Sequence, residues 1–480
     1  MKLLVFAHTP PPHHGQSYMV QVMLEGFGGD RRRNRREDGR WKMEDGLSPA
    51  PPLHPMERGP GGRGHIPYPI FDPAHSTGTE HQRRARRAQD GGAADYGIEC
   101  YHVNTRLSQK LENIGDFRIG KLFLLLGYCL EAIWCRLRYG VTNFYYVPAP
   151  GKRSALYRDW LVMLICRPFF KRAILHWHAA GLSKWLETDV QMRIRSLTYR
   201  LMRQVDLSVV LSKYNRADAE KLFSRRIRVV SNGIADPCPG FAREILPRRK
   251  ARLAARRKLV AGQGLGTDDL KDTGADPQTL KALYLAHCTR DKGLFDTLAG
   301  VALANQRLRE AGSPISVRLV VTGNFVTEAE KAEFELVRAQ TGVREVVEYL
   351  GFVSGEQKNQ LLSQADLFCF PTYYQNENQP VNLLEAMAFG LPILTTRWRS
   401  IPELFPAHYA GLVDAQSPEQ IANTMLALMI GEVGEGFRES FLRSFTLDRH
   451  LSGLAEAFKQ LEQAEPEAVP AKTVTAHPKG

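Results

Sequence analysis

The 480-residue chain lacks the cysteine patterns that hold zinc or a disulfide framework. Its seven cysteines are scattered and odd in number, and none forms a Cys-x-x-Cys pair. Such cysteines are typical of proteins in a reducing compartment. The first residues read directly as a strand, without the long apolar core of a secretory signal. We therefore expect a cytoplasmic protein.

Several other signatures are missing. No G-x-G-x-x-G fingerprint follows the first predicted strand, so a bound dinucleotide is not supported and we expect no cofactor. No Asp-x-Asp motif ends a predicted strand, so we expect no metal. The apolar run at 122–136 is shorter than the ~20 residues that span a bilayer, and Glu131 interrupts it. It predicts a buried amphipathic helix, with peripheral attachment to an acidic membrane left open.

Regular apolar periodicity is absent from about 28–96, where proline, glycine and arginine dominate. This composition predicts a disordered insertion. Arginine-rich segments bind RNA or anionic membranes in other proteins, but no aromatic-interleaved basic face accompanies this one, so no specific nucleic-acid partner is expected. The stretch from about 248 to 277, and the tail at 463–480, also read as loose.

The most informative segment is 370–395. It predicts a strand end, a polar loop, a helix from Pro380 to just before Gly390, and another strand. Pro380 suits the first helical position, and Gly390 suits the left-handed residue after the helix. Apolar runs at 365–370 and 391–396 flank this helix, as in a βαβ unit of a parallel sheet. Ligands bind at the carboxyl ends of such strands.

The start of this predicted helix has the features of an anion site. The amides of Val381 and Asn382 precede the first intrahelical bonds and carry the positive end of the helix dipole. Glu377 lies in the loop before them, and Glu385 lies about 6 Å along the axis from Val381, at ~1.5 Å per residue. A phosphate bound here would have a carboxylate on either side, and each carboxylate could accept hydrogen bonds from sugar hydroxyls. Taken alone, the pair also fits an ordinary surface helix with two solvated glutamates.

Glu377 and Glu385, with the residues around them, resemble the E-x7-E region of the retaining glycosyltransferases of family four, which have the GT-B fold. The resemblance implies that Glu377 contacts the donor hexose, Glu385 contacts the nucleotide ribose and the helix-start amides hold the diphosphate. The family's small–aromatic pair after the first glutamate is Asn378-Gln379 here, which leaves the identity of the sugar open.

Two further stretches agree with this resemblance. Residues 283–293 are similar to the family's strand and loop ending in Lys-Gly, which implies that Lys292, with Arg290, neutralises the leaving diphosphate. His287 stands near where the family often has arginine. Residues 172–182 resemble a strand whose following histidine reaches the donor sugar. His176 and His178 share one face of that strand, and His178 is nearer its end.

The first loop also resembles the family, because Gly15 follows the first strand where GT-B transferases approach the interdomain cleft. The fold class implied is α/β, with two Rossmann-like domains facing a cleft. We place an amino-terminal acceptor domain at 1–233 and a carboxyl-terminal donor domain at 234–435. A helical region at 436–462 would cross back onto the first domain, and 463–480 form the tail. A length of 480 residues favours two cores.

The implied activity is a metal-independent, retaining transfer of a hexose from a nucleotide-sugar to a glycan, lipid-linked or small-molecule acceptor, as in polysaccharide biosynthesis. Catalysis would rest on electrostatics, with Glu377, Lys292 and His178 as its residues. Peripheral contact with the inner face of a membrane fits a lipid-linked acceptor. Two alternatives remain, a nucleotide-sugar 2-epimerase of the same fold and a catalytically silent nucleotide- or glycan-binding protein.

Overall fold

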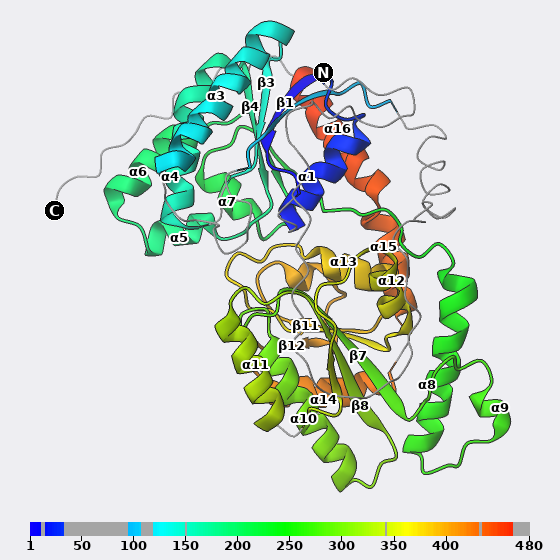
Figure 1. Cartoon of the computed structure of the whole chain (residues 1–480). Helices are drawn as coiled ribbons and strands as arrows, with labels where there is room; N and C mark the ends of the chain where they lie inside the picture. Colours follow the sequence, from blue (N-terminus) through cyan, green and yellow to red (C-terminus); the bar gives the residue numbers. More distant parts are fainter. Residues whose placement is uncertain are drawn as a thin grey trace, which may run out of the picture.

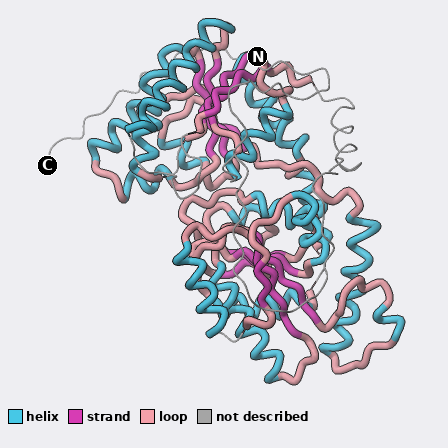
Figure 2. Tube along the Cα trace, viewed as in Figure 1, coloured by secondary structure: helices cyan, strands magenta, loops and turns pink. Residues whose placement is uncertain are grey.

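The computed structural model describes residues 1–10, 15–32, 95–106, 119–148, 151–340, 343–431 and 434–463. The chain forms two lobes, each built on a parallel six-stranded sheet with helices on both faces (Figures 1 and 2). The predicted α/β class with two Rossmann-like domains is confirmed.

The amino-terminal lobe has the strand order β2-β1-β3-β4-β5-β6. Its strands are β1 Lys2–Ala7, β2 Glu99–Asn104, β3 Asn143–Tyr146, β4 Arg172–Trp177, β5 Leu207–Val210 and β6 Ile227–Val229. Its helices are α1 Gly15–Gly26, α3 Ile119–Tyr139, α4 Arg153–Cys166, α5 Leu182–Thr188, α6 Met192–Met202 and α7 Arg216–Lys221. The order reverses between β1 and β3, which places a ligand crevice at the carboxyl ends of these strands.

The carboxyl-terminal lobe has the order β12-β11-β10-β7-β8-β9, the doubly wound order of dinucleotide-type folds. Its strands are β7 Thr279–Leu285, β8 Ser316–Thr322, β9 Val347–Tyr349, β10 Leu367–Phe370, β11 Ile393–Thr396 and β12 Leu412–Val413. Its helices are α8 Leu246–Val260, α9 Thr267–Leu270, α10 Leu294–Glu310, α11 Glu328–Gln340, α12 Gly355–Gln364, α13 Val381–Ala388 and α14 Pro418–Met429. Here the order reverses between β7 and β10.

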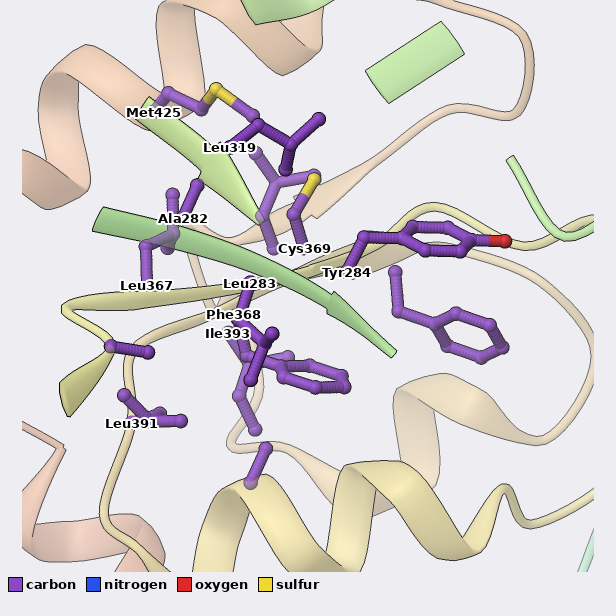
Figure 3. Packing of buried hydrophobic residues seen from close by; sticks show 14 of the residues in the cluster. Ala282, Leu283, Tyr284, Leu319, Leu367, Phe368, Cys369, Leu391, Ile393 and Met425 are labelled. Carbon is purple, nitrogen blue, oxygen red and sulfur yellow. The ribbon is translucent and has the colours of Figure 1, made fainter. Parts of the chain in front are cut away.

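Most of the strand residues are buried and apolar because helices cover both faces of each sheet. In the carboxyl-terminal lobe, Cys369 and Met425 pack on one side of the sheet, and Leu283 and Ile393 pack on the other (Figure 3). The amino-terminal sheet has a separate core on each face. These rigid sheets hold the loops at their carboxyl ends in place.

The last two helices, α15 Glu435–Ser444 and α16 Leu447–Gln463, join the lobes. Helix α16 lies against the amino-terminal lobe (Figure 1), where Leu454 and Phe458 pack with Val5 and Val209. The chain therefore returns to the first lobe, in the region where the sequence places a crossing helix.

The expectation of a loose stretch at 248–277 is wrong for its first half. Most of its first half is helix α8, whose Arg249, Arg252 and Arg256 are buried. Arg252 and Arg256 both pair with the buried Asp366, while Arg249 donates to backbone carbonyls that include Leu362 O at 2.9 Å. Local sequence does not reveal this packing, because the acidic partner of Arg252 and Arg256 lies more than a hundred residues away.

The expectation of a buried helix at 122–136 is wrong for one face of α3. Leu125 and Cys129 pack inward, but Leu130, Trp134 and Leu137 are 66%, 51% and 73% exposed. An amphipathic helix normally turns its apolar residues to the core, whereas α3 carries exposed apolar residues on the outside of the lobe (Figure 1). Across the described ranges, no helix combines the length and apolarity needed to cross a membrane.

Most of the predicted insertion at about 28–96, and the tail beyond residue 463, lie outside the described residues. Of the insertion, residues 28–32 lie against the amino-terminal lobe. Asp30 forms a β-bridge with Cys100, and Arg32 pairs with Asp30 and with Glu131 of α3 at 2.7 Å.

Candidate active site

A cleft of about 1250 Å³ lies between the lobes, lined by loops that follow strands of both sheets. His8 and Gly15 follow β1, His178 follows β4, Lys292 follows β7 and Glu377 follows β10. The cleft therefore meets the carboxyl-terminal sheet where its strand order reverses, the position at which open α/β sheets bind ligands.

Helix α13 begins in this cleft. Pro380 is the residue before the helix, with φ −64° and ψ 127°, rather than its first residue as predicted. Val381 and Asn382 line the cleft, and the side-chain amide of Asn382 donates to Leu285 O at 2.8 Å. At the far end, Gly390 has φ +55°, as its predicted left-handed position requires. The helix thus points its positive end at the cleft.

Glu377 and Lys292 form an ion pair inside the cleft. Lys292 Nζ lies 2.7 Å from Glu377 Oε2, with side chains 17% and 11% exposed. Thr372 also donates to Glu377 Oε2 at 3.2 Å, and the Lys292 ammonium lies 4.3 Å from the centre of the Tyr374 ring. A cation and a carboxylate are therefore held side by side near the start of α13.

Arg290 and His287 lie in the same loop as Lys292 and also line the cleft. The Arg290 guanidinium pairs with Glu333 of α11 and lies over the Phe295 ring, 4.6 Å from its centre. Burial, followed by the charge of Lys292, lowers the pKa of His287 below its usual value. The His287 imidazole is consequently neutral at physiological pH.

Glu385 is not among the residues that line the cleft. It lies one turn along α13, where it accepts a hydrogen bond from Lys358 of α12 and is 13% exposed. Tyr18 of α1 is close enough for the charge of Glu385 to act on it. Burial, and then this charge, raise the pKa of Tyr18 to about 12. The structure places Glu385 at the boundary of the lobes, further from the cavity than Glu377.

The amino-terminal wall brings Gly15 and His178 to the same cleft. A Cβ atom at Gly15 would lie 3.9 Å from Val381 Cγ2, so the starts of α1 and α13 face each other across the lobes. His176 is buried, and its Nδ1 lies 2.6 Å from the Tyr145 hydroxyl. The rings of His176 and His178 are 4.2 Å apart. Of the two histidines, only His178 lines the cleft.

Sequence reasoning missed a basic part of this wall. Arg106, Lys121, Lys152 and Arg158 line the cleft from the amino-terminal lobe. Lys121 lies in α3 and Arg158 in α4, while Lys152 precedes α4 and Arg106 follows β2. No local motif joins these residues, so only the fold brings them together. Among the described residues, no group of three or more histidine, cysteine or acidic side chains is placed to hold a metal.

Residues 267–441, which include Lys292 and Glu377, match the family model described as glycosyl transferases group 1. The match lies within the carboxyl-terminal lobe and covers most of it. The matched region spans the sheet from β7 to β12 and the start of α13. The Lys292–Glu377 pair thus lies within the part of the chain that this model describes.

Two curated relatives are similar to parts of the chain. The amylovoran biosynthesis glycosyltransferase AmsK of Erwinia amylovora is 29% identical over 167 residues, which cover 34% of this chain and 38% of AmsK. WcaL of Escherichia coli K12, assigned to colanic acid biosynthesis, is 26% identical over 227 residues, which cover 44% of this chain and 54% of WcaL. The chain thus aligns with about half or less of the length of these relatives.

Among solved structures, Anabaena HepE in complex with UDP-glucose matches 96% of this chain and 100% of its own, with 13% identity and a TM-score of 0.54. At this identity the likeness concerns the fold alone. Two Rossmann-like lobes that face a cleft are the GT-B fold, so the predicted fold class is confirmed.

Proposed function

We propose that the chain is a glycosyltransferase that moves a hexose from a nucleotide-sugar to an acceptor, with retention at the anomeric carbon. The observation that carries this proposal is the Lys292–Glu377 pair beside the start of α13, in a cleft between two Rossmann-like lobes. The match to the glycosyl transferases group 1 model and the polysaccharide-related relatives support a role in polysaccharide biosynthesis. The complex of HepE with UDP-glucose supports a nucleotide-sugar as donor.

The donor's diphosphate would lie at the amides of Val381 and Asn382, next to the Lys292 ammonium. These groups stabilise the negative charge that develops on the diphosphate as the glycosidic bond breaks. Glu377 accepts hydrogen bonds from sugar hydroxyls and orients the ring, and His178 approaches the sugar from the other lobe. Glu385 is assigned to the nucleotide ribose on the resemblance alone, because it pairs with Lys358 outside the cleft lining. The reaction then needs no metal, cofactor or protein nucleophile.

The acceptor would enter from the amino-terminal wall. That wall combines Lys121, Lys152 and Arg158 with the apolar Leu122 and Leu125. Basic groups next to apolar surface fit an acceptor with a phosphate and a lipid chain. We therefore propose a lipid-linked glycan acceptor in preference to a small polar molecule.

The outer face of α3 supports membrane contact during this reaction. Leu130, Trp134 and Leu137 are exposed in a row, and Arg138 follows them in the last turn of the helix. Apolar side chains that insert at the interface and basic ones that attract anionic lipids are the elements of peripheral binding. We propose that this face contacts the inner leaflet while the cleft receives the acceptor.

The test is to incubate the purified chain with a panel of nucleotide-sugars, with and without polyprenyl-diphosphate-linked glycans, and to follow release of nucleoside diphosphate. A transferase releases the diphosphate only when an acceptor is present. An epimerase would convert the nucleotide-sugar without an acceptor, and a binding protein would do neither.

Glu377→Gln keeps the side-chain shape and removes the charge, and we expect it to abolish turnover. Glu435→Gln, at the exposed pair with Lys250, is the matched control and should retain turnover. Full activity of the Glu377 variant would overturn the assignment of this site.

A further inference from the structure

Two polar residues of the donor loop are buried against the opposite lobe. Asn378 and Gln379 follow Glu377 directly and are 2% and 8% exposed. They are the pair that departs from the small–aromatic pattern of the resembling family. Buried amides require hydrogen-bond partners, and here the partners lie largely in the amino-terminal lobe.

The side chain of Asn378 bridges the two lobes. Its Nδ2 donates to Trp177 O at 3.3 Å and to Asn215 Oδ1 at 2.6 Å. Its Oδ1 accepts from Ser212 Oγ at 3.4 Å and from Ser400 Oγ at 3.0 Å. Trp177 is the last residue of β4, and Ser212 and Asn215 lie in the loop after β5, so both ends of one amide are bonded to the other lobe.

Gln379 adds a second set of bonds at the border between the lobes. Its side-chain oxygen accepts from the backbone amide of Asn232 at 2.5 Å, and its carbonyl accepts from Asn232 Nδ2 at 3.1 Å. Close by, the carboxylate of Glu403 accepts from the backbone amides of Lys213 and Tyr214 at 2.8 and 2.6 Å. The donor loop therefore rests on a network of polar contacts, in which those of Asn378 and Gln379 are buried and those of Glu403 are exposed.

The amino-terminal side of this network is itself rigid. Asn215 Nδ2 donates to Asp218 at 2.9 Å. Asp218 in turn accepts from the backbone amides of Gly181 and Ser183 at 2.8 and 2.7 Å. The loop that carries His178 is thus tied through Asp218 to Asn215, which Asn378 contacts, and Asn215 Nδ2 also donates to Ala179 O at 3.3 Å.

The sequence positions make this contact mechanically important. Trp177 directly precedes His178, and Asn378 directly follows Glu377. One hydrogen-bonded amide therefore links the backbones that carry the candidate residues of the two lobes. We propose that Asn378 is a positioning residue that fixes the separation of His178 and Glu377 by holding the lobes together. Its effect on turnover rests on the proposed function, whereas its effect on the lobes does not.

The test uses Asn378→Asp, which keeps the shape but replaces the Nδ2 donor with an acceptor facing Trp177 O. Asn305→Ala is the matched control, because Asn305 is buried and bonds both to Val317 N and to Val317 O within one lobe. Small-angle scattering without ligand measures the radius of gyration, and donor-saturated kinetics measure kcat. Thermal unfolding measures stability.

We expect Asn378→Asp to increase the radius of gyration and to lower kcat at least tenfold. Asn305→Ala should lower Tm while leaving the radius of gyration and kcat unchanged. Asn215→Ala combined with Asn378→Asp should lower kcat no further than Asn378→Asp alone, since the two residues share one contact. An unchanged radius of gyration in Asn378→Asp would overturn the proposal, as would an equal increase in Asn305→Ala. If no nucleotide-sugar is turned over, the proposed function fails, but the scattering comparison still decides the role of Asn378.

Discussion

Acidification is expected to destabilise the protein through His450 of α16. His450 is 2% exposed, and its Nδ1–H donates to Ser231 O at 2.7 Å. Its ring lies 6.2 Å from that of the buried His176. Burial lowers the pKa of His450 to about 4, although the bond to Ser231 opposes the change. Burial, and then the charges of His178 and His450, also lower the pKa of His176.

The direction of the effect follows from proton binding. An unfolded histidine has a pKa of about 6.5, so between pH 6.5 and 4 the unfolded chain binds a proton that the folded chain does not. The stability from neutral His450 is therefore complete above pH 6.5 and is lost as the pH falls toward 4. Between pH 7.5 and 5.0 this loss amounts to about 2 kcal/mol of unfolding free energy. His176 adds a loss of the same sign.

Urea unfolding at pH 7.5 and 5.0 measures this loss. His450→Asn retains an amide donor for Ser231 O and removes the titrating ring, so its loss of stability should be smaller than that of the wild type by about 2 kcal/mol. His408→Asn, at an exposed histidine with φ +64°, should lose as much as the wild type. An equally steep loss in His450→Asn would refute the reasoning.

Three further predictions concern the site, the fold and the membrane face. Lys292→Met should lower kcat by roughly 10²–10³ in the nucleotide-sugar assay, since it removes a cation from the developing diphosphate charge, whereas Lys250→Met should not. Gly390→Ala should lower the unfolding free energy by about 1–3 kcal/mol in urea titrations, because φ is +55° and the added Cβ would lie 2.6 Å from Phe241. Trp134→Glu should weaken sedimentation with anionic vesicles, while Leu336→Glu, on the exposed face of α11, should leave it unchanged.

The most accurate sequence predictions concern the residues at which a helix begins and ends. Pro380 and Gly390 bound α13 within one residue of the predicted limits, because a fixed φ and a left-handed φ act at single positions. The flanking apolar runs became β10 and β11, which pair in parallel as predicted. Features encoded within about thirty residues were therefore readable without the fold.

Features that depend on residues far apart in the sequence could not be predicted from it. Arg252 and Arg256 appear as solvent-facing charges until Asp366 is brought to them. The exposed apolar residues of α3 show the reverse error. Their composition predicts burial, but in the folded lobe they are exposed. Burial is set by tertiary arrangement, and composition alone does not determine it.

The Lys292–Glu377 contact links recognition of the diphosphate to recognition of the sugar. As the two groups stand, each neutralises the other at 2.7 Å, and a carboxylate engaged in an ion pair is a weaker acceptor for a hydroxyl. In the proposed reaction, a diphosphate at the start of α13 competes for Lys292 with a higher negative charge, and Glu377 then becomes available to the sugar. Since the Asn378 side chain is bonded to the opposite lobe directly after Glu377, the released carboxylate keeps its place in the cleft. Binding of the nucleotide moiety would accordingly precede selection of the sugar at this site.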